Sequence, residues 1–206
     1  KKLLINGVWL PAASGATFPS HDPATGAHLV DLAEAGADDV EAAVASSRAA
    51  FVSDAGRGLT PSARGKLLWR IADLIETHAD ELAEIEAIDM GKSVTFARDV
   101  DIQGTIDTFR YFAGWASKLH GRTVEPSLPG NYLAYTRKEP LGVVAAIVPW
   151  NFPLLTMAWK LAAALAAGCT VVVKPAELTS LSTLRFDELV EEAGIPAGVV
   201  NIVTGK

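Results

Sequence analysis

Residues 142–203 read GVVAAIVPWNFPLLTMAWKLAAALAAGCTVVVKPAELTSLSTLRFDELVEEAGIPAGVVNIV. Three apolar runs divide this stretch, at Val143–Val148, Thr170–Val173 and Val199–Val203. The first two runs do not alternate with polar residues, which is typical of strands buried on both faces of a parallel sheet. The stretch therefore predicts three strands, each separated from the next by more than ten residues.

The segments between these runs have the features of helices. Residues 153–167 begin with a proline and are followed by Gly168, a common helix stop. The second segment has Ser180 or Ser182 as a possible cap and Gly194 as its stop. Parallel strands need such crossover helices, and the crossovers are right-handed in nearly all proteins. The order strand, helix, strand, helix, strand predicts half of a doubly wound α/β sheet.

The first 139 residues predict a different organisation. Ile5–Trp9 contains Asn-Gly and predicts a hairpin, because this pair suits the positive φ angles of a two-residue turn. Apolar spacing then predicts four helices, which begin near Asp38 or Asp39, at Thr60-Pro61, around Leu82 before Gly91, and at Val94. The last of these is expected to continue to Leu119. Residues 121–139 contain the helix breakers Pro126, Pro129 and Gly130, followed by the alternating run Tyr132–Thr136, and predict a two-stranded excursion. An isolated ribbon is marginal in water, so this one is expected to pack on something, such as a second subunit.

Composition excludes several classes of protein. The chain has 206 residues, 50% of them hydrophobic, so it has enough apolar side chains for a sizeable core and is not an acidic disordered tail. A net charge of −6 provides no basic stripe for nucleic acid. No run approaches the roughly 20 apolar residues that span a bilayer, so no membrane partner is expected. We expect a cytoplasmic protein. Because the chain starts with lysine, a removed transit peptide is the alternative.

Other residues resemble functional motifs but fail on inspection. Gly91-Lys92-Ser93 is similar to the end of a phosphate-binding P-loop, but position 86 is Glu rather than Gly and a helix precedes it. The four histidines have no metal-ligand spacing, and the single cysteine excludes cysteine pairs, so we expect no metal site. Cys169 lies between a helix stop and a buried strand, so we expect a buried structural thiol rather than a nucleophile.

Polar residues follow the first two predicted parallel strands. Ligands of open parallel sheets bind beyond the carboxyl ends of the strands. Asn151 stands there after the first strand, and its amide NH2 is a neutral donor for a carbonyl oxygen that gains negative charge. An N-cap asparagine of the following helix is an equally weighted alternative.

Two lysines and a carboxylate complete the set of candidates. Lys174 and Glu177 leave the second strand together, and such a pair suits a ribose, since the carboxylate accepts from hydroxyls and the lysine donates. The alternative for this pair is an exposed ion pair of little consequence. Lys160 lies in an apolar helix, where it either extends to solvent or is held against a polar group.

At these loops the sequence resembles the aldehyde dehydrogenase superfamily. Four motifs in order carry the resemblance, and it extends weakly back to Asn6-Gly7 and Asp22–Gly26, so it covers nearly the whole chain. The motifs are EPLGVV at 139–144, PWNFP at 149–153, KPAE at 174–177 and GIPAGVVN at 194–201.

The resemblance implies NAD(P)+-dependent oxidation of an aldehyde to a carboxylic acid. It implies that Asn151 holds an oxyanion and that Lys160 supports the active site. It also implies that Lys174 and Glu177 contact the adenine ribose. The full set implied in cofactor binding is Ile147, Val148, Pro149, Trp150, Asn151, Lys174, Pro175, Ala176 and Glu177. A carboxylate at the ribose repels a 2′-phosphate, so NAD is favoured over NADP, although Lys174 and Ser180 leave dual use open.

The resemblance also divides the chain. It implies that residues 1–120 are the N-terminal part of a cofactor-binding domain and that residues 140–206 are its βαβαβ core. It implies that residues 121–139 are an arm through which a homo-oligomer, a dimer or tetramer, assembles. The family's nucleophilic cysteine, its general-base glutamate and its catalytic domain are absent from the chain, so we expect the 206 residues alone to be inactive. A truncated cofactor-binding or assembly module and a CoA-acylating branch of the superfamily are the alternatives. Phe152, Met157 and Trp159 are candidates for the wall of the aldehyde tunnel, and core packing is the other explanation for them.

Overall fold

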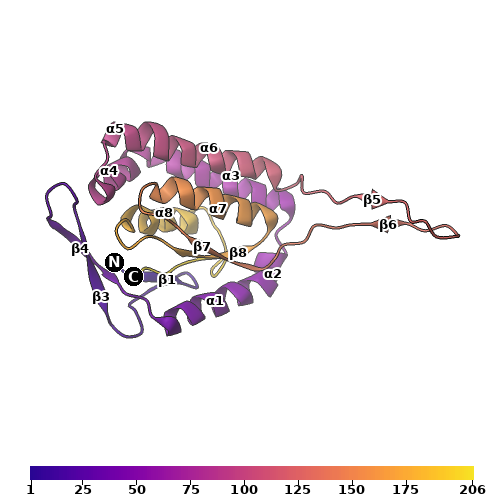
Figure 1. Ribbon diagram of the computed structural model, residues 1–206, viewed down its shortest axis with the longest axis horizontal. Helices are drawn as coiled ribbons and strands as arrows, with labels where there is room; N and C mark the ends of the chain where they lie inside the picture. Colours follow the sequence, from indigo (N-terminus) through magenta and orange to yellow (C-terminus); the bar gives the residue numbers. More distant parts are fainter.

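A computed structural model describes residues 1–206 as an α/β structure around a five-stranded sheet (Figure 1). The strands of the structure are β1 (Leu3–Ile5), β2 (Val8–Leu10), β3 (Thr17–His21), β4 (His28–Ala33), β5 (Thr123–Val124), β6 (Ala134–Tyr135), β7 (Val143–Ile147), β8 (Thr170–Lys174) and β9 (Val200–Ile202). The helices are α1 (Ala37–Val52), α2 (Asp54–Arg57), α3 (Pro61–Thr77), α4 (Ala79–Met90), α5 (Val94–Phe96), the π-helical segment η1 (Ala97–Ile102), α6 (Gln103–Trp115), α7 (Pro153–Ala167) and α8 (Leu181–Glu192).

The predicted parallel strands are confirmed. β7, β8 and β9 are neighbours in that order and run parallel, with α7 and α8 as their crossovers. β8 is buried along its length until Lys174, as its unbroken apolar run predicts. β7 is less buried than predicted because it forms the edge of the sheet and leaves Ala145 and Ile147 exposed. Gly168 ends α7 in a left-handed conformation (φ +90°) that other residues rarely adopt.

The sheet is mixed rather than wholly parallel. The predicted Asn-Gly hairpin is confirmed as β1 and β2, with φ +56° at Asn6 and +69° at Gly7. This hairpin adds to the sheet, because β1 pairs antiparallel with β9 through Leu4 and Ile202. The sequence pattern did not predict this addition, since nothing local to residues 3–10 specifies a partner 198 residues away. The N-terminal hairpin is thus part of the same core as the last strand.

Helices cover both faces of the sheet. α1 packs on one face, and α7 and α8 pack on the other, where α3 and α6 form an outer layer (Figure 1). The main core lies between α7 and these neighbours, with Leu161, Val171 and Phe109 fully buried. The predicted helix at 94–119 forms but ends at Trp115 and includes η1. α1 begins at Ala37, where the Asp39 carboxylate accepts the Gly36 N–H (2.9 Å).

Residues 121–139 form the predicted two-stranded excursion. β5 and β6 pair antiparallel, and the hairpin extends away from the body of the molecule (Figure 1). Large apolar side chains are exposed along it, at Leu128, Tyr132, Leu133 and Tyr135.

None of the helices combines the length and the apolar character that a membrane crossing requires.

Candidate cofactor-binding and active site

The candidate residues lie at one edge of the sheet, because the strands that carry them are neighbours. Ile147 and Lys174, the last residues of β7 and β8, are partners in the parallel ladder. The Val148 N–H then donates to the Lys174 carbonyl (3.0 Å). The two loops therefore start side by side at the carboxyl ends of the strands, where ligands of open α/β sheets bind.

A direct hydrogen bond joins the two loops. The Thr179 hydroxyl, in the loop after β8, donates to the Trp150 carbonyl in the loop after β7 (3.0 Å). Thr179 is itself buried, and its N–H donates to the Ala176 carbonyl (3.1 Å). The positions of the Asn151 loop and of the Lys174–Glu177 loop are consequently coupled.

Asn151 has an exposed side chain whose amide makes no hydrogen bond within the chain. The residue at the cap position of α7 is Phe152, and no side chain caps this helix. The structure therefore does not support the N-cap alternative for Asn151. The amide NH2 is a free donor beside the carboxyl end of β7.

Lys174 and Glu177 form the predicted pair. The Lys174 Nζ lies 3.7 Å from Glu177 Oε2, with the side chains 30% and 44% exposed. This distance is too long for a good hydrogen bond, so both groups keep most of their hydrogen-bonding capacity. A ribose that offers two hydroxyls meets an acceptor and a donor here, so the residues present fit a nucleotide cofactor.

The other predicted residues differ in exposure. Ile147, Pro149 and Trp150 are exposed and are accessible to a ligand, Ala176 is partly exposed, and Val148 and Pro175 are buried. Buried side chains contribute to a site only by shaping its backbone. Lys160 is exposed on α7, and its Nζ donates to the Ile147 carbonyl at the end of β7. The sequence left open whether Lys160 extends to solvent or is held against a polar group, and the structure shows that it is held against the Ile147 carbonyl.

Behind the Asn151 loop lies a charged cluster that sequence reasoning missed. Lys92 forms an ion pair with Asp101, and its Nζ also donates to the Asn151 carbonyl (3.1 Å). The Glu86 carboxyl accepts the Leu154 N–H (3.0 Å). Burial, together with a hydrogen bond to Asp101, raises the pKa of Glu86 to about 8. Lys92 and Glu86 drew attention in the sequence only as parts of a failed P-loop motif, so their contacts were not predicted.

A second carboxylate of α4 supports the neighbouring loop. Asp89 accepts the Leu181 N–H (2.8 Å) and the Ser20 hydroxyl (3.0 Å). Burial raises the pKa of Asp89 to about 6. Ser180 occupies the N-cap position of α8, as one of the two predicted cap residues, but its side chain makes no capping hydrogen bond, and Asp89 supplies the acceptor at this helix end. Side chains from a distant helix replace the local cap.

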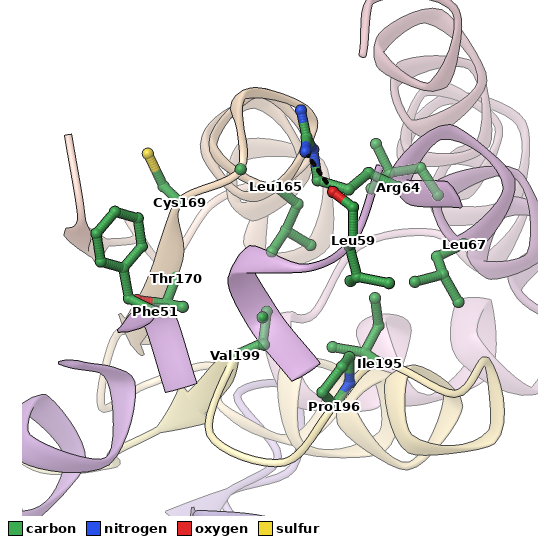
Figure 2. Close-up of a pocket in the computed structure, with 13 residues that line it drawn as sticks. Phe51, Leu59, Arg64, Leu67, Leu165, Cys169, Thr170, Ile195, Pro196 and Val199 are labelled. Atoms are coloured by element: carbon green, nitrogen blue, oxygen red, sulfur yellow. Dashed lines mark hydrogen bonds between the residues drawn. The ribbon is translucent and has the colours of Figure 1, made fainter. Parts of the chain in front are cut away.

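The small apolar pocket of Figure 2 lies at the amino-terminal end of β8, away from the Asn151 loop. Cys169 and Thr170 line it at the start of β8, the opposite edge of the sheet from Asn151. Its volume is about 30 Å³, room for about one water molecule. Arg64 also lines the pocket, and its guanidinium donates to the carbonyls of Leu59 (2.9 Å) and Ala166 (3.2 Å). Cys169 is buried, as predicted, and this pocket is too small for a dinucleotide.

An open groove of about 430 Å³ lies between α6 and α7. Trp159 lines it from α7, and Tyr111 and Phe112 line it from α6. The suggestion that Met157 walls a substrate tunnel is wrong, because its side chain is fully buried in the core. The helix turns Met157 towards the sheet and Trp159 away from it. Trp159 remains a candidate wall residue.

Comparisons with known proteins agree with this arrangement. The model of the aldehyde dehydrogenase family matches residues 9–206. The chain belongs to the aldehyde dehydrogenase family. It is 48% identical to phenylacetaldehyde dehydrogenase of Pseudomonas fluorescens over 100% of the chain and 42% of that protein. It is 47% identical to human retinal dehydrogenase 2 over 99% of the chain and 39% of that protein.

A solved structure of the family has the same fold. The NAD+ complex of an aldehyde dehydrogenase from Bacillus cereus superposes with a TM-score of 0.96 at 48% identity, over 100% of this chain and 41% of that one. The predicted α/β, Rossmann-like fold and the family resemblance are confirmed. The chain spans about two-fifths of the length of the family members it matches.

Proposed function

We propose that this chain is the cofactor-binding part of an NAD+-dependent aldehyde dehydrogenase that oxidises an aldehyde to a carboxylic acid. The observation that carries the proposal is the pairing of Ile147 with Lys174, which starts the Asn151 loop and the Lys174–Glu177 loop side by side. Family membership and the likeness to an NAD+ complex support it.

In this proposal each candidate side chain has a distinct task. NAD+ would supply the hydride acceptor of this oxidation. The free amide of Asn151 donates a hydrogen bond to the aldehyde oxygen, which gains negative charge when a nucleophile adds to the carbonyl carbon and before the adduct loses its hydride, and a preorganised donor lowers the barrier at this point. Lys160 holds the Ile147 carbonyl, and so keeps the end of β7 in place next to this loop.

The same proposal assigns the ribose to Lys174 and Glu177. Glu177 accepts from the ribose hydroxyls and repels a 2′-phosphate, so NAD+ is the expected cofactor. The chain by itself is expected to bind NAD+ without turnover, because its one thiol, Cys169, is buried at the opposite edge of the sheet. The division into a domain at 1–120, an arm at 121–139 and a core at 140–206 is part of this proposal, as is assembly of a homo-oligomer through the arm.

The test is an assay of the complete gene product. Its intact mass is measured first, and a mass well above the 21.7 kDa of this chain is expected. NADH formation is then followed with aliphatic and aromatic aldehydes, phenylacetaldehyde among them. Asn151→Ala is expected to lower kcat by about 100-fold without changing the Kd for NAD+, because only the transition-state donor is lost.

Asn131→Ala is the matched control, since Asn131 is exposed and belongs to the segment between β5 and β6, the hairpin that extends away from the body of the molecule (Figure 1). It is expected to leave kcat unchanged. A complete gene product that binds NAD+ but forms no NADH with any aldehyde would contradict the proposal and favour a binding module. An Asn151→Ala variant with unchanged kcat would remove Asn151 from the mechanism.

A further inference from the structure

The cluster behind the Asn151 loop is almost completely removed from solvent. Side chains of Glu86 and Asp101 are 0% exposed, and that of Lys92 is 8% exposed. The Lys92 Nζ contacts both carboxyls, as an ion pair with Asp101 and at 4.0 Å from Glu86 Oε2. Burying charged groups is costly even when they are paired, and apolar replacements are often at least as stable. Stability alone is therefore a weak explanation for three ionisable groups at this place.

The cluster balances its charge by holding a proton. Glu86 Oε2 and Asp101 Oδ1 are both buried and have no donor. The raised pKa of Glu86, about 8, comes first from burial and then from a hydrogen bond with Asp101, so Glu86 carries a proton at neutral pH. That proton lies between the two carboxyls and satisfies both oxygens.

The cluster makes two hydrogen bonds to the backbone between Asn151 and Leu154. At one end the Lys92 Nζ donates to the Asn151 carbonyl (3.1 Å). At the other end Glu86 accepts the Leu154 N–H (3.0 Å). Between them the Phe152 ring lies under the ammonium, with 4.5 Å from Nζ to the ring centroid. These contacts fix the backbone from the Asn151 carbonyl to Leu154, directly after the Asn151 side chain, and the Thr179 hydroxyl holds the Trp150 carbonyl directly before it.

An unusual helix segment delivers the third member of the cluster. Asp101 belongs to η1, a π-helical segment, and well under 1% of residues in proteins have this conformation. π-helical turns inside α-helices occur frequently at functional sites. The segment turns Ala97, Asp101 and Ile102 inward, so the Asp101 carboxyl meets Lys92 inside the protein.

We propose that Glu86, Lys92 and Asp101 are positioning residues that hold the Asn151 amide in its catalytic orientation. This inference rests on the proposed function, because it assigns Asn151 a role in the reaction. The cluster does not touch substrate or cofactor. It acts through the backbone, and its loss is expected to lower kcat while leaving cofactor affinity intact.

The first test is Lys92→Met in the complete gene product, with Lys66→Met at an exposed position of α3 as the matched control. Lys92→Met is expected to lower kcat by about 10- to 100-fold, because small displacements of a catalytic group are that costly. The Kd for NAD+ is expected to stay within about two-fold, since Lys92 contacts neither Lys174 nor Glu177 and the hydrogen bond from Thr179 to Trp150 that joins the two loops remains. Lys66→Met is expected to leave both quantities unchanged.

A second measurement does not depend on turnover. Amide hydrogen exchange of residues 148–156, followed by mass spectrometry, is expected to be faster in Lys92→Met than in the unmodified protein and in Lys66→Met. A core peptide within residues 170–174 provides the internal reference and is expected to be unchanged. Faster exchange in both peptides would mean general destabilisation and would overturn the assignment.

Two substitutions of Glu86 separate positioning from filling of space. In Glu86→Gln the amide oxygen accepts the Leu154 N–H and the amide NH2 donates to Asp101, which reproduces the protonated acid. We expect this variant to keep its kcat, and Glu86→Leu to lose about as much as Lys92→Met. The ionisable groups that face Glu86 are Asp101 and Lys92, and the Ser182 hydroxyl also donates to it (3.2 Å), so ionisation of Glu86 above about pH 8 adds a negative charge next to the Asp101 carboxyl. The kcat ratio of unmodified protein to Glu86→Gln is therefore expected to fall above that pH.

The outcomes distinguish this inference from the proposed function. If the complete gene product forms no NADH, the proposed function fails, and the exchange measurement still decides whether the cluster holds the loop. If NADH forms and Lys92→Met retains both its kcat and its slow exchange at 148–156, the positioning inference is overturned. Equal losses in Glu86→Gln and Glu86→Leu would overturn the shared proton.

Discussion

Glu177 is the residue on which cofactor choice depends. Its side chain is partly exposed next to Lys174 and is held only by a long ion pair. We expect Glu177→Gln to raise the affinity for NADP+ relative to NAD+ by about 10-fold, because the repulsion of a 2′-phosphate disappears. Calorimetric titration of both cofactors measures this ratio. Glu139→Gln, at an exposed position outside the site, is the control, and an identical ratio in the two variants would remove Glu177 from cofactor selection.

Asp187 is a buried carboxyl that the structure leaves without any partner. It is 0% exposed on α8, and neither carboxyl oxygen accepts a hydrogen bond. Burial raises its pKa well above the usual value, so the folded chain keeps a proton that the unfolded chain releases. We expect Asp187→Ala to stabilise the fold by about 1–3 kcal/mol, the cost of an unsatisfied buried group. Urea denaturation measures the free energy of unfolding.

The pH dependence of this stabilisation provides a check. Because the raised pKa makes the unmodified protein less stable as pH rises, the advantage of Asp187→Ala is expected to be larger at about pH 8 than at about pH 5. Asp99→Ala, at an exposed and unbonded position of η1, is expected to change stability by less than about 0.5 kcal/mol. A destabilised Asp187→Ala at both pH values would show that the carboxyl has a compensating role.

At the scale of elements, α4 organises the start of both crossover helices. Glu86 accepts the Leu154 N–H of α7, and Asp89, one turn further on, accepts the Leu181 N–H of α8. Two carboxyls three residues apart lie on one face of a helix, so a single element sets the start of both helices that follow site-bearing strands. Local sequence near 150 and 180 contains no sign of this, because the acceptors come from residues about 70 to 90 positions earlier.

The arm is a separate element with its own prediction. Val124 and Ala134 are paired across the hairpin, so replacing residues 125–133 by Asn-Gly closes the ladder with a two-residue turn. This change removes Leu128, Tyr132 and Leu133, which are exposed apolar side chains. We expect a smaller oligomer in sedimentation equilibrium and an unchanged Kd for NAD+, since the arm projects away from the candidate site (Figure 1). An unchanged oligomer mass would contradict assembly through the arm.

At the scale of the whole molecule, carboxyls with raised pKa values make stability depend on pH. Asp89 has a pKa of about 6 and Glu86 of about 8, against 3.8 and 4.5 for ordinary groups. The folded chain holds more protons than the unfolded chain between these values, so the free energy of unfolding is expected to fall as pH rises from about 4 to about 8. Thermal unfolding across this range measures the fall.

Matched variants assign this fall to particular groups. Asp89→Asn keeps an acceptor for the Leu181 N–H and is expected to flatten the curve between about pH 4 and 6. Glu86→Gln is expected to flatten it up to about pH 8. If both variants follow the unmodified protein, these carboxyls are ionised in the folded state and the assignment is wrong.

Sequence alone determined the parallel β7–β8–β9 core, its two crossover helices, the N-terminal hairpin and the loops that carry Asn151 and Lys174. These features follow from apolar runs, glycine stops and turn residues, which act within a few positions of one another. Family motifs lie in the same short segments, so the resemblance was visible in the sequence as well.

Only the tertiary structure decided what surrounds those loops. The pairing of β1 with β9, the hydrogen bond from Thr179 to Trp150 and the inward turn of Met157 depend on packing between distant segments. The Glu86–Lys92–Asp101 cluster is the clearest example. Glutamate, lysine and aspartate are usually found at the surface. Here they form a buried, proton-sharing cluster where α4, η1 and α7 meet. The cost of burying their charge is offset by partners from distant segments, which no local sequence pattern specifies.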